Sequence, residues 1–176
     1  LDMVCQKTED CKIDFSNDGL EIFVDSDFIK AKNTTLGADN GIAVAMILSI
    51  LENDEIAHPP IEAVFTTDEE VGMLGMTAAW ENDRHIFDNV GLMINLEARG
   101  PYGPCLLFET CPGNEKIMDL YAEAADYKYT YSLTTVVYTF MPNFTDFTIV
   151  KDEVPGLNFS TICDVNHYHT DKDNFS

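Results

Sequence analysis

The sequence predicts a three-layer α/β/α sandwich with a mixed, largely parallel central sheet. Short extended segments alternate along the chain with helical patterns, and such alternation is typical of helices that cover both faces of a sheet. The 176 residues are 45% hydrophobic and 11% aromatic, which is enough for one packed core. The sequence contains no internal repeat, low-complexity tract or linker. We therefore predict a single domain over residues 1–176.

The first half of the chain contains three predicted strands and two predicted helices. Two short strands, 20–24 and 28–31, flank a turn-forming Asp-Ser-Asp sequence. Residues 41–51 are apolar on nearly every side, which predicts a buried helix packed against a sheet. A His-Pro-Pro sequence then breaks the chain before a strand at 61–66, and a short helix is predicted at 77–82.

The second half alternates in the same way. Residues 91–96 and 105–108 form apolar runs that predict two more strands. Apolar residues recur at helical spacing over 114–125, which predicts an amphipathic helix. Two further strands are predicted at 134–140 and 156–159, where β-branched and aromatic residues cluster.

The composition excludes several classes of partner. The formal net charge is −21, from 31 acidic and 10 basic side chains. Nucleic acids and anionic membrane surfaces both require clustered Lys and Arg, so neither is an expected partner. No run of about 18 apolar residues is present, and the sequence therefore predicts no membrane-spanning helix. The five cysteines form no Cys-x-x-Cys pair, which favours a reducing compartment and a cytoplasmic location.

Acidic residues gather where predicted strands end or a predicted helix begins. Asp39 lies in a Gly-flanked turn before the first helix, Glu69 and Glu70 follow the third strand, and Glu97 ends the fourth strand. In an open α/β sheet, the ligand crevice lies beyond the carboxyl ends of the strands. Carboxylates that meet there repel one another unless a cation neutralises them. Together with His169 near the C-terminus, these carboxylates suit Zn²⁺, with Mn²⁺ or Co²⁺ as alternatives.

Each of these residues also has a purely structural alternative. A single acidic residue at a strand end is usually a solvated turn residue or a helix cap. Glu69 and Glu70 also suit the first turn of a helix, where the macrodipole favours negative charge. A lone histidine such as His169 is more often a surface or hydrogen-bonded residue than a metal ligand. What favours the metal site is that all four candidates occur together in one chain: Asp39, the Glu69–Glu70 pair, Glu97 and His169.

The motifs around these residues resemble two related families of metallopeptidases. Segments in the first half resemble the aminoacyl-histidine dipeptidases: residues 1–7, 34–41, 58–60 and 66–70. Segments in the second half resemble the di-zinc aminopeptidases, a group that includes the glutaminyl cyclases: residues 95–100, 107–110, 142–148, 155–159 and 168–170. Both families belong to the superfamily of co-catalytic zinc exopeptidases, so the resemblance implies the α/β/α zinc exopeptidase fold.

The resemblance implies ligands for two zinc ions. Asp39 corresponds to the carboxylate that bridges the two metals. Glu70 and His169 correspond to the other protein ligands of one zinc, and Glu97 corresponds to the carboxylate on the second. In the dipeptidases, a histidine that also binds the second zinc directly precedes the Leu-Asp-Met-Val sequence, with which this chain begins.

The resemblance also implies roles for residues around the metals. Asp2 corresponds to the carboxylate that orients the missing histidine, and Glu69 corresponds to the general base. Tyr168 and Arg99 are weaker candidates for contacts to the oxyanion or the substrate backbone; the alternatives are packing for Tyr168 and an ion pair for Arg99. Asp146 is a candidate for orienting a ligand histidine or binding the substrate amine, with a cap as its alternative.

These observations predict a metal-dependent exopeptidase, either an aminopeptidase or a dipeptidase, that hydrolyses peptides through a metal-bridging water and a Glu general base. The first alternative is a glutaminyl-cyclase-like acyltransferase, and the second is an inactive peptidase-like binding domain. Both ends of the sequence favour a fragment that lacks the first metal-ligating histidine and the C-terminal elements. Secretion is the alternative to the cytoplasmic location, because many relatives of the second half are secreted or luminal.

Overall fold

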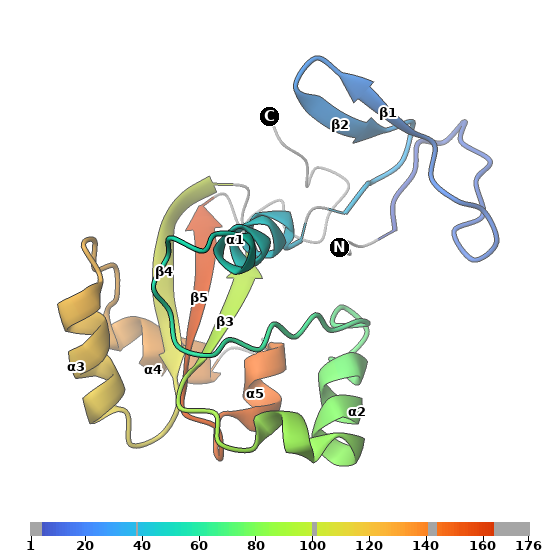
Figure 1. Ribbon diagram of the computed structural model, residues 1–176. Coiled ribbons are helices and arrows are strands. Elements are labelled where there is room, and N and C mark those ends of the chain that lie inside the picture. The colour runs from blue at the N-terminus through green and yellow to red at the C-terminus, as the bar shows by residue number, and fades with distance from the viewer. Residues whose placement is uncertain (1–4, 38, 100–101, 141–143, 164–176) are drawn as a thin grey trace.

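The computed structural model describes residues 5–37, 39–99, 102–140 and 144–163 (Figure 1). Groups of strands and groups of helices follow one another along this range. In chain order they are β1 (Ile22–Asp25), β2 (Phe28–Ala31), α1 (Gly41–Glu52), α2 (Leu74–Asn82), the 3₁₀ helix η1 (Arg84–Phe87), β3 (Met93–Ala98), β4 (Tyr102–Thr110), α3 (Glu115–Ala124), α4 (Ser132–Phe140), α5 (Asp146–Val150) and β5 (Gly156–Cys163).

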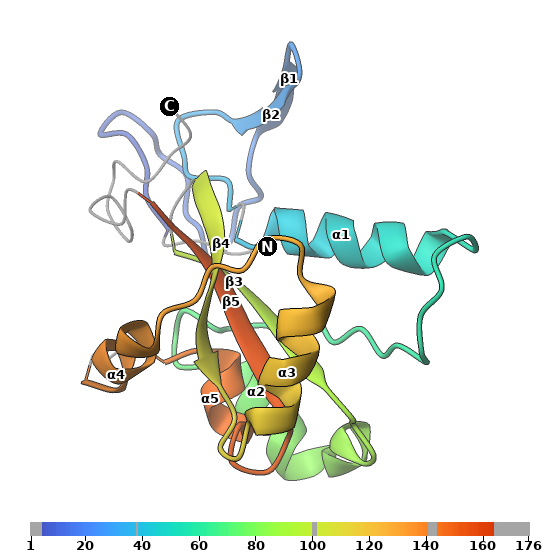
Figure 2. The same cartoon turned by 90° about the vertical axis from the view of Figure 1, so that its left-hand side faces the viewer.

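A mixed three-stranded sheet forms the centre of the structure. Its strand order is β3-β5-β4, with β5 parallel to β3 and antiparallel to β4. Helices flank both faces, with α4 on one side and α1 on the other (Figure 2). Tyr121 of α3 packs on Phe159 of β5, with ring centroids 5.8 Å apart. The α/β fold class with helices on both faces of a mixed sheet is therefore confirmed.

The hydrophobic core lies where α5 and α2 meet the start of β5. Phe147 and Val150 of α5 are almost completely buried, and they cluster with Met76 of α2 and with Val154. The ring of Phe147 also lies against Gly156, the first residue of β5, where the absence of a side chain leaves room for it. This packing fixes α5 and the amino end of β5 together.

Most of the predicted elements form as expected. The two predicted N-terminal strands form the antiparallel hairpin β1–β2. The predicted helices at 41–51, 77–82 and 114–125 correspond to α1, α2 and α3, and three of the strands predicted after them correspond to β3, β4 and β5. The helices of the described residues are all too short or too polar to cross a membrane.

The strand predicted at 61–66 is absent from the structure. These residues belong to an irregular connection between α1 and α2 (Figure 1). Ile61, Val64 and Phe65 are exposed there. Within the described part of the chain, β3 pairs with β5 and no ladder includes this segment. A run of β-forming residues becomes a strand only where its backbone groups find a partner, so the prediction from composition was wrong here.

The strand predicted at 134–140 is instead part of helix α4. The edge of β4 that such a strand would use is taken by an earlier segment, because the Leu107 N–H donates to the Tyr129 carbonyl at 2.9 Å. The helix that follows packs Tyr138 edge-on against Phe108 of β4, with centroids 4.8 Å apart. Tertiary packing therefore overrides the β propensity of this segment.

Helix α1 has the predicted position but not the predicted burial. Ala43 is its one buried residue, whereas Ile42 is 67% exposed and Met46 is 50% exposed. Figure 2 shows the helix projecting beside the sheet. An all-round apolar pattern indicates that a helix is suited to burial, but it does not identify the surface that covers it.

Candidate metal and catalytic site

Asp39 lies directly before helix α1. The next residue, Asn40, caps the helix, since its side-chain oxygen accepts a hydrogen bond from the Ala43 N–H at 3.2 Å. The peptide bond between Asp39 and Asn40 is cis. Asp39 is half-buried and lies one residue before the N-cap of α1. The predicted turn before the first helix is thus present and carries the carboxylate.

The start of the described chain lies beside the segment that leads to Asp39. The Thr35 N–H donates to the Gln6 carbonyl at 2.9 Å, and the Gln6 N–H donates to the Thr35 hydroxyl at 3.0 Å. The Thr8 N–H donates to the Asn33 carbonyl at 3.0 Å. These bonds bring the N-terminal segment to the turn that holds Asp39. Asp2 itself lies outside the described residues.

A tight turn over residues 67–73 carries Glu69 and Glu70. The Glu69 carbonyl accepts hydrogen bonds from the N–H groups of Gly72, at 3.0 Å, and Met73, at 2.9 Å. Asp68, Gly72 and Met73 all have positive φ angles, of 57°, 111° and 56°. A non-glycine residue in this conformation is strained by about 1–2 kcal/mol, and such strain is concentrated at functional sites. The backbone conformation therefore marks this turn as a candidate for function.

Gly75 allows helix α2 to approach this turn closely. Its N–H donates to the Thr67 carbonyl at 3.0 Å. A Cβ atom added at Gly75 would lie 2.7 Å from the backbone nitrogen of Thr67, which is closer than packed atoms approach. The glycine thus fixes the position of the turn that carries Glu69 relative to α2.

Replacing Gly75 with alanine is expected to destabilise the protein by about 1–3 kcal/mol, because the clash is with backbone atoms that cannot rotate away. Chemical unfolding measures the loss. Gly91→Ala is the matched control, since a Cβ at Gly91 would meet nothing within 4 Å. Equal stability of the two variants would show that the close approach is not required.

Glu97 lies near the end of β3, and its pKa is raised well above the ordinary value. The pKa of Glu97 is raised to about 8, and the largest cause is burial of the carboxyl group. A hydrogen bond from Asn95 acts in the opposite direction and lowers this pKa. The negative charges of Glu69 and Asp39 raise the pKa of Glu97 further, while Arg99 lowers it. The carboxylates of Asp39 and Glu69, from two other parts of the chain, therefore each lie near enough to Glu97 to repel it.

Arg99 acts on Glu97, and Asp146 is linked to the segment that precedes Glu69. The Arg99 guanidinium donates to the Phe144 carbonyl at 3.3 Å and lies 5.7 Å from the ring centroid of Tyr138. Asp146 is the first residue of α5, is buried, and accepts a hydrogen bond from the Thr66 hydroxyl. It thereby joins α5 to the segment that precedes Glu69. Their substrate contacts remain predictions.

The remaining candidates are placed only in part. Glu70 is half-buried in the same turn as Glu69. Tyr168 and His169 lie outside the described residues. Within the ranges that the structure describes, no three His, Cys, Asp or Glu side chains form a group that could hold a metal ion. The predicted ligand roles of Asp39, Glu70, Glu97 and His169 therefore stay predictions.

The donor chemistry fits a divalent cation. Oxygen ligands from carboxylates, completed by an imidazole such as that of His169, suit Zn²⁺, Mn²⁺ or Co²⁺. The repulsion that Glu69 and Asp39 exert on half-buried Glu97 is of the sign that a cation offsets.

Sequence reasoning missed a row of polar residues beneath Glu97. Asn95, Asn158 and Glu109 lie side by side on β3, β5 and β4, joined by hydrogen bonds. Asn95 precedes Glu97 by two residues and so lies on the same face of the strand. The spacing of two residues between Asn95 and Glu97 could have been noticed in the sequence. The partners of Asn95 on the other strands could be identified only from the register of the sheet.

Comparison with known proteins gives a family match and several partial relatives. The sequence model of Peptidase family M28 matches residues 20–176. The cytosol non-specific dipeptidase of Escherichia coli strain K12 is 45% identical over 75 residues, which are 43% of this chain and 16% of that protein. Endoplasmic reticulum metallopeptidase 1 of Homo sapiens is 26% identical over 154 residues, covering 83% and 17% of the two chains.

The mouse protein gives a similar result. Endoplasmic reticulum metallopeptidase 1 of Mus musculus is 27% identical over 165 residues, covering 89% of this chain and 18% of that protein. The chain therefore spans less than a fifth of the length of these curated relatives, between 16% and 18%. No solved structure matches the chain significantly.

Proposed function

Because this chain belongs to peptidase family M28, we propose that it acts as a metal-dependent exopeptidase, either an aminopeptidase or a dipeptidase, and that residues 1–176 form its catalytic domain. The family match confirms the resemblance to the co-catalytic zinc exopeptidases. The relatives are a dipeptidase and metallopeptidases by name, which supports a peptide as the substrate.

One observation of the structure carries the proposal. Asp39 lies just before α1, Glu69 in the turn before α2 and Glu97 near the end of β3, and the charges of Asp39 and Glu69 both raise the pKa of Glu97. A chain with this many acidic residues could keep them apart on its surface. Gathering three half-buried carboxylates in one region is unfavourable unless the region serves a cation or a proton transfer.

The metal ligands of the proposal are Asp39, Glu70, Glu97 and His169. They would hold two ions, with Zn²⁺ expected and Mn²⁺ or Co²⁺ as alternatives. When bound, such ions polarise the scissile carbonyl and make the attacking water more acidic. Asp39 would be the ligand that the two ions share.

Glu69 would move the proton in the reaction. It would accept a proton from the attacking water and transfer it to the amine that leaves. This role requires a carboxylate near the metals that does not bind them, and adjacent Glu69 and Glu70 divide the two tasks. Asp2 would orient a ligand histidine, whereas Arg99, Tyr168 and Asp146 are the proposed contacts to the substrate.

The decisive experiment compares three reactions of the full-length protein. After loading with Zn²⁺, Mn²⁺ or Co²⁺, the protein is given aminoacyl-nitroanilides, unblocked dipeptides and a peptide with N-terminal glutamine. We expect metal-dependent hydrolysis of at least one unblocked substrate, and no hydrolysis when the amino group of an aminoacyl-nitroanilide is acetylated. Cyclisation of the glutamine peptide without hydrolysis would instead show an acyltransferase, and tight metal binding without either reaction would contradict an enzyme.

A further inference from the structure

We propose that Asn95 and Asn158 are positioning residues, which hold the Glu97 carboxylate for metal binding through a row of hydrogen bonds anchored at the Glu109–Lys151 ion pair. The inference rests on the proposed metal-dependent function and adds the residues that orient one of its ligands. It is carried by four hydrogen-bonded contacts that cross all three strands of the sheet.

Asn95 fixes one oxygen of the Glu97 carboxylate. Its side-chain nitrogen donates to Glu97 Oε1 at 2.9 Å and also to Asn158 Oδ1 at 2.9 Å. The amide NH₂ has two hydrogens, so these two acceptors use both. Asn95 cannot rotate about its side chain without losing one of the bonds, and Glu97 is thereby tied to the neighbouring strand.

Asn158 is held even more firmly. It lies on the central strand β5, and none of it is exposed to solvent (0%). Its nitrogen donates to Glu109 Oε2 at 3.0 Å and to Thr145 Oγ1 at 2.9 Å, while its oxygen accepts from Asn95. Flipping the amide would set the nitrogen against the NH₂ donor of Asn95 and the oxygen against the Glu109 carboxylate. The orientation of the Asn158 amide is therefore fixed by these two partners.

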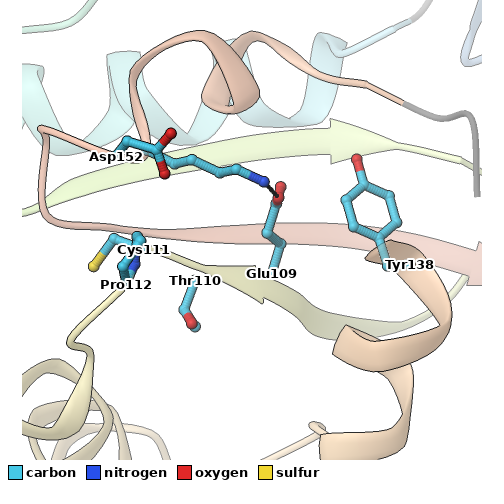
Figure 3. A pocket seen from close by; sticks show the side chains of 7 residues that line it. Glu109, Thr110, Cys111, Pro112, Tyr138 and Asp152 are labelled. Carbon is cyan, nitrogen blue, oxygen red and sulfur yellow. Dashed lines mark hydrogen bonds and ion pairs between the residues drawn. The ribbon is translucent and has the colours of Figure 1, made fainter. Parts of the chain in front are cut away.

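The row ends at a largely buried ion pair. Lys151 Nζ lies 2.6 Å from Glu109 Oε1, and the Glu109 side chain is 5% exposed. Figure 3 shows this ion pair as a dashed line at Glu109. Both residues line a pocket of about 350 Å³, together with Tyr138 and Asp152. A buried carboxylate needs both a counter-ion and hydrogen-bond donors. Lys151 supplies the charge and Asn158 supplies a donor, which keeps Glu109 fixed as an acceptor.

The direction of the row connects it to the site. One end of the row is Lys151, which follows α5, and the other end is Glu97 on β3. Between these ends the hydrogen bonds pass from Glu109 on β4 to Asn158 on β5 and then to Asn95 on β3. A residue that orients a metal ligand through a hydrogen bond usually changes metal affinity by 10- to 100-fold when it is lost. The geometry assigns that role to Asn95 directly and to Asn158 through Asn95.

The test uses Asn95→Ala in the full-length protein, titrated with Co²⁺ and followed by its visible absorption. We expect Co²⁺ to bind about 10- to 100-fold more weakly and the absorption bands to change, because the Glu97 carboxylate is no longer held. Asn114→Ala is the matched control, as it removes a bond from Asn114 to the Thr110 hydroxyl on the same sheet but outside the row. Its affinity and spectrum are expected to stay within about twofold of the parent.

The outcomes separate this inference from the proposed function. Unchanged Co²⁺ affinity and spectrum in Asn95→Ala, with a parent protein that binds Co²⁺ and hydrolyses peptides, would overturn the positioning role alone. A parent protein that binds no Co²⁺ would overturn the function itself. If Asn95→Ala does not fold, Asn95→Ser is measured instead, and weaker binding with altered bands is again the supporting result.

Discussion

Glu69→Ala is expected to lower the rate of peptide hydrolysis by about 10²- to 10⁴-fold while metal remains bound. The carboxylate in the strained turn over residues 67–73 is the proposed proton acceptor, and the variant removes this group without removing a proposed metal ligand. Metal content by mass spectrometry and kcat are measured on the same preparation. Full peptidase activity in Glu69→Ala would end the mechanism proposed for this site.

Two further variants distinguish loss of the proton acceptor from loss of charge and from loss of metal. Glu81→Ala makes the same change of charge at an exposed residue of α2 and is expected to leave kcat unaltered. Asp39→Ala is expected to lose bound metal as well as activity, since Asp39 is the proposed bridging ligand. A Glu69→Ala protein that lost its metal would place Glu69 among the ligands rather than beside them.

Glu97→Gln is expected to make the metal-free protein more stable at pH 7.5 and to weaken metal binding at the same time. The folded protein holds the pKa of Glu97 at about 8, whereas the ordinary value is 4.5. Between these two pH values the folded state retains a proton that the unfolded chain has released. The free energy of unfolding therefore falls as pH rises through this window, by up to about 1.4 kcal/mol per pH unit.

Glutamine has nearly the shape of glutamate but does not ionise, so the variant avoids this loss. Urea unfolding of the chelator-treated proteins from below pH 4.5 up to pH 8 measures the difference, which should be absent below pH 4.5 and grow with pH above it. Glu81→Gln, at an exposed position, is the control and should follow the parent. A Glu97→Gln protein that is no more stable than the parent at pH 7.5 would contradict the burial and repulsion described for Glu97.

The central elements were predictable because their sequence patterns are local. The apolar runs that became β3 and β5 and the helical spacing that became α3 reflect contacts made by each segment on its own faces. The segment 61–66 and helix α4 were not predictable in this way. Val136 and Val137 favour strands by themselves, but the edge of β4 was already bonded to Tyr129. Only the sheet order decides which segment obtains a partner.

The candidate residues were chosen from where strands were expected to end and helices to begin. Asp39 does lie just before α1 and Glu97 near the end of β3, but the strand expected before Glu69 is absent, and Glu69 lies in a turn instead. The charges of Asp39 and Glu69 both raise the pKa of Glu97, while the roles of all three residues stay predictions. Asn95 and Asn158 were not found, because a single amide in a strand has no distinctive pattern. Their significance arises from the register of β3 against β5, in which the two residues are direct neighbours.

The strand order also determines when the sheet can assemble. β3 and β4 follow one another in the chain, yet each pairs with β5, which begins only at Gly156. On the ribosome, both outer strands emerge before the strand that joins them. Their pairing requires contacts between distant parts of the chain, which form slowly. Until β5 is synthesised, Asn95 and Glu109 lack their shared partner Asn158, so Glu97 acquires this support only after β5 has been made.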